Sequence, residues 1–186
     1  MQALVEASQA PNFPARPVLI VSNRPGAPGL EIAARHGLPQ ATVDHTQYGR
    51  DREAFERALS EVLETADVEM VALAGFMRIL SPWFIRKWGD RMINIHPSLL
   101  PKYPGLNTHA RAIEAGDTIA GCSVHWVSEG VDTGEIIAQA DIPIEAGDTP
   151  TTLAQKVLVC EHELYPKALI LAARQIRNKR DIACTS

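Results

Sequence analysis

Two side chains near the middle of the chain have the types and spacing needed to stabilise a developing oxyanion. Asn94 and His96 are two residues apart at the end of a largely apolar segment, residues 91–96, that predicts a β-strand. Alternate residues of a strand project from the same face, so the amide and the imidazole should lie side by side. Pro97 follows directly and forces an extended exit from the strand. Both side chains can donate hydrogen bonds to an oxyanion, as acyl transfer requires.

An acidic partner for this pair is Asp132, in a short loop between Gly130 and Gly134. Glycines let the backbone turn sharply and approach a ligand closely. A carboxylate near His96 would favour the imidazolium, which is a hydrogen-bond donor near neutral pH. Simpler interpretations stay open: Asn94 could cap a turn, His96 could be a hydrogen-bonded core histidine, and Asp132 could bond its own loop.

Ser123 and His125 alternate onto one face of the predicted strand that precedes the Asp132 loop. They either support Asp132 or hydrogen-bond each other, and we favour the supporting role.

The elements that must position these residues alternate between strand and helix in the first half of the chain. This order predicts an α/β fold with a doubly wound, mostly parallel sheet and ligands at the carboxyl ends of its strands. The expected strands are residues 18–21, 68–74, 91–96, 122–128 and 135–144. The expected helices are residues 30–36, 51–66, 81–88 and 108–115, then a long helical region from residue 149 that Pro166 should kink or restart. We expect one domain, residues 1–186, with a frayed polar tail at 178–186.

Composition narrows the class of protein. A formal net charge of -4 gives no basic footprint for nucleic acid, and no apolar run is long enough to span a bilayer. The three cysteines, Cys122, Cys160 and Cys184, form no CxxC pair, which argues against structural zinc or a disulfide framework. The histidines form no convincing ligand cluster, so we expect no metal. A cytoplasmic enzyme acting on small molecules fits best, as a monomer or a homodimer.

One long motif carries a resemblance to a known family. Residues 94–106 read Asn-Ile-His-Pro-Ser-Leu-Leu-Pro-Lys-Tyr-Pro-Gly-Leu, and they are followed by Ser123-Val124-His125 and by Asp-Thr-Gly-Glu-Ile-Ile at 132–137. These strings resemble the folate-dependent formyltransferases. The continuation over residues 102–106 resembles the branch that acts on glycinamide ribonucleotide. The likeness runs from Met1 to about Ala173 and is most specific in the middle.

The resemblance implies formyl transfer from 10-formyltetrahydrofolate to the amine of glycinamide ribonucleotide, a step of purine synthesis that needs no metal. Asn94 and protonated His96 would stabilise the tetrahedral oxyanion, with His96 as general acid. Asp132 would hold His96 charged and help to relay the proton of the amine.

The same likeness implies where the two substrates bind. The folate would contact Asn94 and the residues Arg52, Met77, Arg78, Ile79, Leu80, Ser128, Glu129, Gly130, Val131 and Asp132. The ribonucleotide would contact Pro97, Leu158 and Glu161. Without the likeness, Met77 and Ile79 read as core residues at a strand-to-helix turn, and Arg52 and Glu161 as solvated side chains on helices.

The start of the chain departs from the expected pattern. Residues 1–8 look helical, although such folds normally begin with a strand, and the free α-ammonium has the wrong sign for a helix N-terminus. The family resembled begins with a strand and a Gly-x-Gly-Ser-Asn loop that binds the substrate phosphate, and residues 1–4 match the positions directly after that loop. We therefore expect a fold apparently lacking its first strand. We also expect weak or no transferase activity, and recovery once the upstream segment is restored.

Two rival functions stay open. A formyltetrahydrofolate deformylase would use water in place of the amine, and formate release without glycinamide ribonucleotide would identify it. A catalytically impaired folate-binding truncation would bind tetrahydrofolate analogues without transferring a formyl group.

Overall fold

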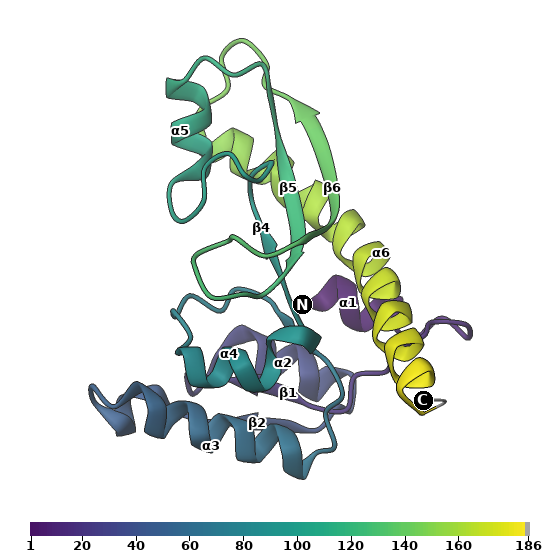
Figure 1. The fold of residues 1–186 in the computed structure, drawn as a ribbon. Helices are drawn as coiled ribbons and strands as arrows, with labels where there is room; N and C mark the ends of the chain where they lie inside the picture. Colours follow the sequence, from purple (N-terminus) through teal and green to yellow (C-terminus); the bar gives the residue numbers. More distant parts are fainter. Residues whose placement is uncertain (185–186) are drawn as a thin grey trace.

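The computed structural model describes residues 1–184, and Figure 1 shows the arrangement of its helices and strands. In chain order these are α1 (Gln2–Ala7), β1 (Ile20–Ser22), α2 (Pro28–Arg35), β2 (Gln40–Thr42), α3 (Arg52–Thr65), β3 (Val71–Leu73), α4 (Pro82–Trp88), β4 (Met92–His96), α5 (Thr108–Glu114), β5 (Ile119–Trp126), β6 (Ile136–Pro143) and α6 (Pro150–Cys184). Two short 3-10 helices, His45–Tyr48 and Gly89–Arg91, complete the fold.

Two helices begin where their capping residues predict. The Asp51 carboxylate accepts a hydrogen bond from the Ala54 amide at 2.9 Å, which satisfies one free N–H group of the first turn of α3. The Ser81 hydroxyl does the same for the Phe84 amide at the start of α4, where Pro82 occupies the first helical position. Both predicted starts are confirmed.

The strands form two sheets that alternate with helices, so the predicted α/β class is confirmed. Strands β1 and β2 pair in parallel, as do β3 and β4, whereas β5 and β6 join β4 in antiparallel order. The last two predicted strands, residues 122–128 and 135–144, correspond to β5 and β6, which pair with each other. Strand β2 was not predicted. It has only three residues, Gln-Ala-Thr, which are largely exposed and show no strand pattern.

A large cavity separates the two sheets. It has a volume of about 1490 Å³, and every residue of β1 and of β3 lines it. Met1, Leu4 and Val5 of the first helical segment also line it, so α1 lies at its border. Within the described residues, β1 and β3 therefore have no strand partner on the side that faces the cavity.

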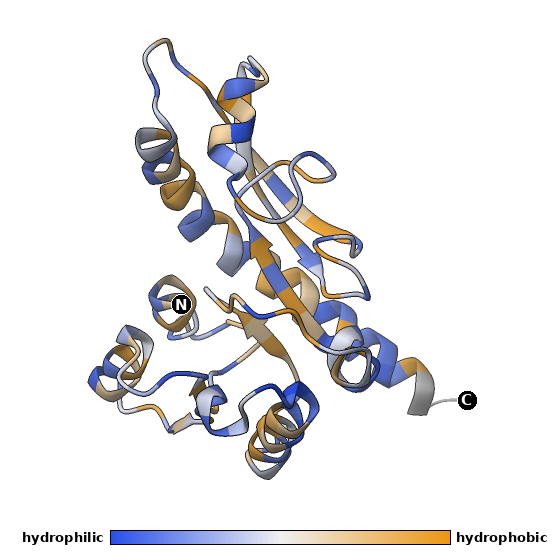
Figure 2. Ribbon diagram, turned by 90° about the vertical axis from the view of Figure 1, so that its left-hand side faces the viewer, coloured by the Kyte–Doolittle hydropathy of each residue, from blue (hydrophilic) through white to orange (hydrophobic). Residues whose placement is uncertain are grey.

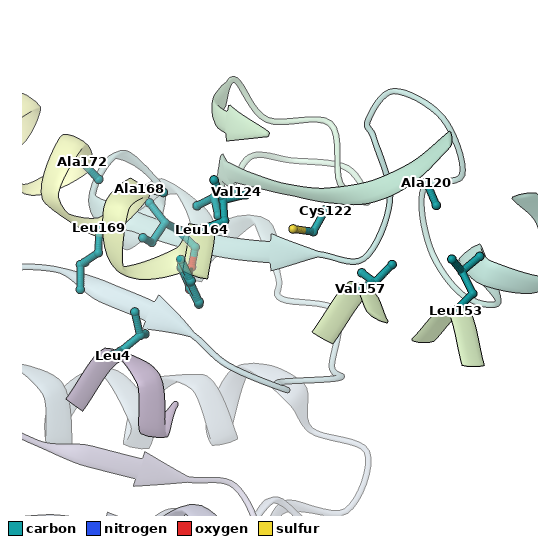
Figure 3. Close-up of a cluster of buried hydrophobic side chains, with 12 residues drawn as sticks. Leu4, Ala120, Cys122, Val124, Leu153, Val157, Leu164, Ala168, Leu169 and Ala172 are labelled. Atoms are coloured by element: carbon teal, nitrogen blue, oxygen red, sulfur yellow. Dashed lines mark hydrogen bonds between the residues drawn. The ribbon is translucent and has the colours of Figure 1, made fainter. Parts of the chain in front are cut away.

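The largest cluster of buried side chains lies between β5 and the long helix α6, as Figure 3 shows. Ala120, Cys122 and Val124 project from β5, and α6 supplies Leu153, Val157, Leu164, Ala168, Leu169 and Ala172. Hydrophobic stretches follow the strands in Figure 2. A second cluster, which includes Phe84 and Trp88, lies between α3, α4 and β4.

Helix α6 continues through Pro166 as one 35-residue helix, so the chain does not restart there. Its last residues fall within the segment 178–186 that we expected to be frayed, and residues 185–186 lie outside the described part of the chain. That expectation stays a prediction.

Candidate active site

Strands β4 and β5 bring the candidate residues together through their register. Asn94 lies opposite His125, and His96 lies opposite Ser123. In an antiparallel pair, opposed residues share a face and their Cβ atoms are about 5 Å apart. The four polar side chains therefore lie on one face, at the carboxyl end of β4.

The Asp132 loop reaches this face because of its unusual backbone. Asp132 has φ of +54°, in the left-handed region that aspartate tolerates better than most residues. A Cβ atom at Gly134 would lie 1.6 Å from the Trp126 carbonyl oxygen, so only glycine fits there. The loop is thereby held against the end of β5.

His96 is buried, and both of its ring nitrogens face acceptors. Nε2 lies 2.9 Å from the Tyr103 carbonyl oxygen, and Nδ1 lies 3.2 Å from the Asp132 carboxylate. Neither acceptor can donate a hydrogen, so only the doubly protonated imidazolium satisfies both contacts.

The Asp132 carboxylate has further partners that favour its ionised form. Its Oδ2 accepts a hydrogen bond from the Gly105 amide at 2.8 Å, and its Oδ1 lies 3.5 Å from His125 Nε2. Burial works to raise the pKa of Asp132. The hydrogen bonds from His125 and Gly105, with the nearby charge of His96, outweigh burial and hold that pKa below its ordinary value. Asp132 is therefore a carboxylate at neutral pH.

His125 links Asn94 to Asp132. Its Nδ1 lies 2.9 Å from the Trp126 carbonyl, which can only accept, so Nδ1 carries a hydrogen. Its Nε2 lies 3.5 Å from Asn94 Nδ2 and 3.5 Å from the Asp132 carboxylate, so it donates to Asp132 when it carries a hydrogen and accepts from Asn94 when it does not. The structure thus places Asn94, His125, Asp132 and His96 in one connected polar group.

Ser123 has a different partner from the one we expected. Its hydroxyl donates to the Ser98 carbonyl at 2.6 Å and accepts from the Leu100 amide at 3.0 Å. Gln139 of β6 also donates to it, at 2.8 Å. Ser123 therefore fixes the loop that follows His96 and makes its contacts there, rather than with Asp132.

The segment after β3 exposes two apolar side chains. Leu73 pairs with Asn94, so the carboxyl ends of β3 and β4 meet. Met77 is 76% exposed and Ile79 is 66% exposed, which excludes the core interpretation for both, whereas Leu80 is buried. The Arg78 guanidinium lies 5.4 Å from the centre of the Phe55 ring, near the exposed Arg52 at the start of α3.

The predicted substrate residues lie on two different elements. Pro97 follows His96, whereas Leu158 and Glu161 lie on α6, with Leu158 about half exposed. Burial raises the pKa of the Glu161 carboxyl above its ordinary value, and the charge of the Met1 α-ammonium partly opposes the shift.

The remaining predicted folate residues, 128–131, lead into the Asp132 loop, and Ser128 is hydrogen-bonded with Thr133 at 3.2 Å.

Sequence reasoning missed two backbone groups of the site, the Tyr103 carbonyl and the Gly105 amide. Both come from the loop that returns over His96. The dense run of proline and glycine at residues 101–105 signalled an ordered loop, but nothing in it showed which main-chain groups face inward.

The described residues contain neither a candidate metal site nor a helix able to span a membrane. Within residues 1–184, no three His, Cys, Asp or Glu side chains come together as a metal site would require. None of the helices in the same range combines the length and apolar character needed to cross a membrane.

Known proteins resemble this chain over nearly its whole length. The family model described as formyl transferase matches residues 1–169. The phosphoribosylglycinamide formyltransferase of Escherichia coli is 41% identical over 166 residues, covering 89% of this chain and 78% of that protein. The trifunctional purine biosynthetic protein adenosine-3 of Bos taurus is 45% identical over 173 residues, and the chain spans only 17% of its length. The crystal structure of phosphoribosylglycinamide formyltransferase from Brucella melitensis matches with a TM-score of 0.88 and 46% identity, over 93% of this chain and 88% of that one.

Proposed function

The chain belongs to the formyl transferase family, and on that premise we propose that it transfers the formyl group of 10-formyltetrahydrofolate to the amine of glycinamide ribonucleotide. The observation that supports this most directly is the 3.2 Å contact between His96 and Asp132, on the face that also carries Asn94. The relatives named for this reaction or for purine biosynthesis support the choice of substrates.

Two donors would stabilise the oxyanion. Attack of the amine on the formyl carbon forms a tetrahedral intermediate with a negatively charged oxygen. The Asn94 amide is one donor, and His96 Nδ1 is the other, because this nitrogen faces the side where Asp132 and His125 lie. His96 Nε2 is held by the Tyr103 carbonyl, which fixes the orientation of the ring. Preorganised donors of this kind lower the barrier without further rearrangement.

One proton must move from the attacking amine to N10 of the departing tetrahydrofolate. The Asp132 carboxylate accepts the proton of the amine, and His96 donates its own proton to the leaving nitrogen. Transfer from Asp132 to His96 then restores the starting state of both groups. The direct contact between Nδ1 and the carboxylate, at 3.2 Å, supports this last step.

The exposed apolar pair Met77 and Ile79 supports a folate surface at the end of β3. Flat heteroaromatic rings gain most from burial against such side chains. In this proposal, Leu80 and residues 128–132 complete the pocket, and Arg78 and Arg52 meet the negatively charged tail of the folate. Pro97, Leu158 and Glu161 contact the ribonucleotide.

The test is a transfer assay with both substrates, followed by detection of formylglycinamide ribonucleotide. We expect product that depends on both substrates and on His96, with His96→Asn reducing kcat about 100-fold or more. Formate release that is unchanged when glycinamide ribonucleotide is omitted would instead identify a deformylase. Binding of a tetrahydrofolate analogue with no transfer at saturating substrate would identify a folate-binding protein.

We place the reaction in the cytoplasm, where both substrates would be available, and the site as proposed is compatible with a monomer or a homodimer.

A further inference from the structure

Two cysteines that are 38 positions apart in the sequence meet between β5 and α6. The Sγ atoms of Cys122 and Cys160 lie 3.7 Å from each other, and both residues are free thiols. Cys122 projects from β5 into the main apolar cluster (Figure 3), and Cys160 packs against the same cluster from α6. Sequence spacing alone gave no sign of this pairing, because the contact depends on how α6 crosses the sheet.

The two sulfur atoms lie near enough to each other for a disulfide to form after a small movement. A disulfide requires an Sγ to Sγ distance of about 2.05 Å, so the two sulfurs must approach by less than about 2 Å. Side-chain rotation and a small shift of α6 can supply this movement. Most of the surrounding side chains are apolar, and the charged group that acts on the Cys122 thiol is the Glu161 carboxyl next to Cys160 in the sequence.

We propose that Cys122 and Cys160 form a thiol-oxidation site, which a low-molecular-weight disulfide such as oxidised glutathione converts into an internal disulfide joining β5 to α6. The proposed formyl transfer assigns no role to either thiol, so this inference is independent of it.

The two thiols differ in accessibility, and this sets the order of the steps. Cys160 is only partly buried, so its thiolate attacks one sulfur of oxidised glutathione and releases the first glutathione thiolate. The product is a mixed disulfide between Cys160 and glutathione. The Cys122 thiolate then attacks Cys160 Sγ and releases the second glutathione. Overall, two protein thiols are oxidised to one disulfide, and one glutathione disulfide is reduced to two thiols.

Burial makes the second step slow. Cys122 is fully buried, and burial raises the pKa of its thiol, with the neighbouring Cys160 adding to the shift. The thiolate is the attacking form, so closure of the bond should accelerate as pH rises. Accumulation of the mixed disulfide at Cys160 should therefore precede the internal bond.

The experiment treats the full chain with oxidised glutathione and maps its cysteines under non-reducing conditions. We expect transient glutathione addition at Cys160, then loss of the two thiol hydrogens and a crosslinked peptide pair containing Cys122 and Cys160. The midpoint of thermal unfolding should rise on the order of 10 °C, because the bond closes a loop of this length, and dithiothreitol should reverse the rise.

Two variants make the test specific. Cys184→Ser removes the remaining thiol of the chain and should oxidise as the unaltered chain does. Cys160→Ser replaces a partly buried residue by one of similar size, so it should fold but form no internal bond and show no rise in midpoint. Stable glutathione on Cys160 without closure, or a bond that includes Cys184, would overturn the proposal.

Discussion

The contacts of His96 divide the work of the site between its two ring nitrogens. Tyr103 binds Nε2 through a backbone carbonyl, which can only accept a hydrogen bond, so Nε2 is the donor in this contact. Asp132 binds Nδ1 through a carboxylate that is ionised at neutral pH. A proton can therefore leave or reach the ring only through Nδ1. In the proposed mechanism, this asymmetry makes Asp132 the residue on which proton transfer depends.

Replacing Asp132 by asparagine should abolish proton relay while keeping the size of the side chain. We expect Asp132→Asn to lower kcat about 100- to 10,000-fold, with much smaller changes in the KM values. Asp148→Asn is the matched control, because Asp148 is also buried in its ion pair with Lys156 but belongs to the loop before α6. The measurement is steady-state kinetics of transfer. Equal losses in the two variants would show that Asp132 acts only through stability.

Asp132 should also make stability depend on pH. Its pKa in the folded protein lies below the ordinary 3.8, so its stabilising contribution is complete above 3.8 and is lost as pH falls through the folded value. The gap in urea midpoint between the unaltered chain and Asp132→Asn should therefore be constant from pH 7 to about pH 5 and shrink below about pH 4. Denaturation curves over this range measure it. A gap that widens with acid would contradict the assigned direction of the shift.

At the scale of elements, the sequence predicts the ends of β4, α3 and α4 well because each end has a local cause. The Asn-Ile-His alternation followed by Pro97 marks the end of a strand, and Asp51 and Ser81 cap helices through their own neighbours. Contacts between distant segments have no such local cause. The partner of Ser123, the carbonyl over His96 and the meeting of Cys122 with Cys160 are all set by tertiary packing. The sequence could therefore predict the candidate catalytic residues but not the groups that support them.

The conformation of the Asp132 loop should depend on the absence of a side chain at Gly134. Gly134→Ala would drive a Cβ atom into the Trp126 carbonyl, so the loop must move away from β5. We expect a loss of about 1 to 3 kcal/mol in unfolding free energy and a loss of transfer activity. Gly29→Ala in α2 is the control, since its Cβ would meet only the flexible Met1 side chain at 3.4 Å, and alanine favours a helix. Urea denaturation of both variants provides the measurement. A Gly134→Ala variant as stable as the control would contradict the contact.

The two-stranded sheet of β1 and β2 should open more readily than the four-stranded sheet of β3 to β6. Each of its strands has three residues, and β1 faces the cavity rather than β3. Two-stranded ribbons are marginal in isolation, whereas β4 is paired on both sides. Hydrogen exchange should therefore be fastest at Ile20–Ser22 and Gln40–Thr42, and slowest in β4 and β5. Equal protection of all these strands would show that the cavity does not weaken the pairing.

At the scale of the whole molecule, the candidate catalytic group and the cavity lie on different strands. The group is built on β4 and β5, which carry the two main clusters of buried side chains. The cavity lies between β1 and β3, each of which lacks a strand partner on that side within the described residues. Strand β1 pairs in parallel with β2 and β3 pairs in parallel with β4, so we expect the space between β1 and β3 to accept one further parallel strand.

Filling that space should stabilise the whole chain. A segment of about six β-branched residues can be joined ahead of Met1, because Met1 lines the cavity. We expect this segment to pair with both strand edges and to bury its side chains against both sheets. Each side chain that becomes buried should add about 1.5 to 3 kcal/mol, so the unfolding midpoint should rise markedly. Protection from hydrogen exchange should increase in β1 and β3 together, because one strand pairs with both. The control is the same segment with proline at alternate positions, which keeps the added length but cannot donate the ladder hydrogen bonds. An equal rise with the proline segment would mean that added apolar mass, rather than a paired strand, stabilises the protein.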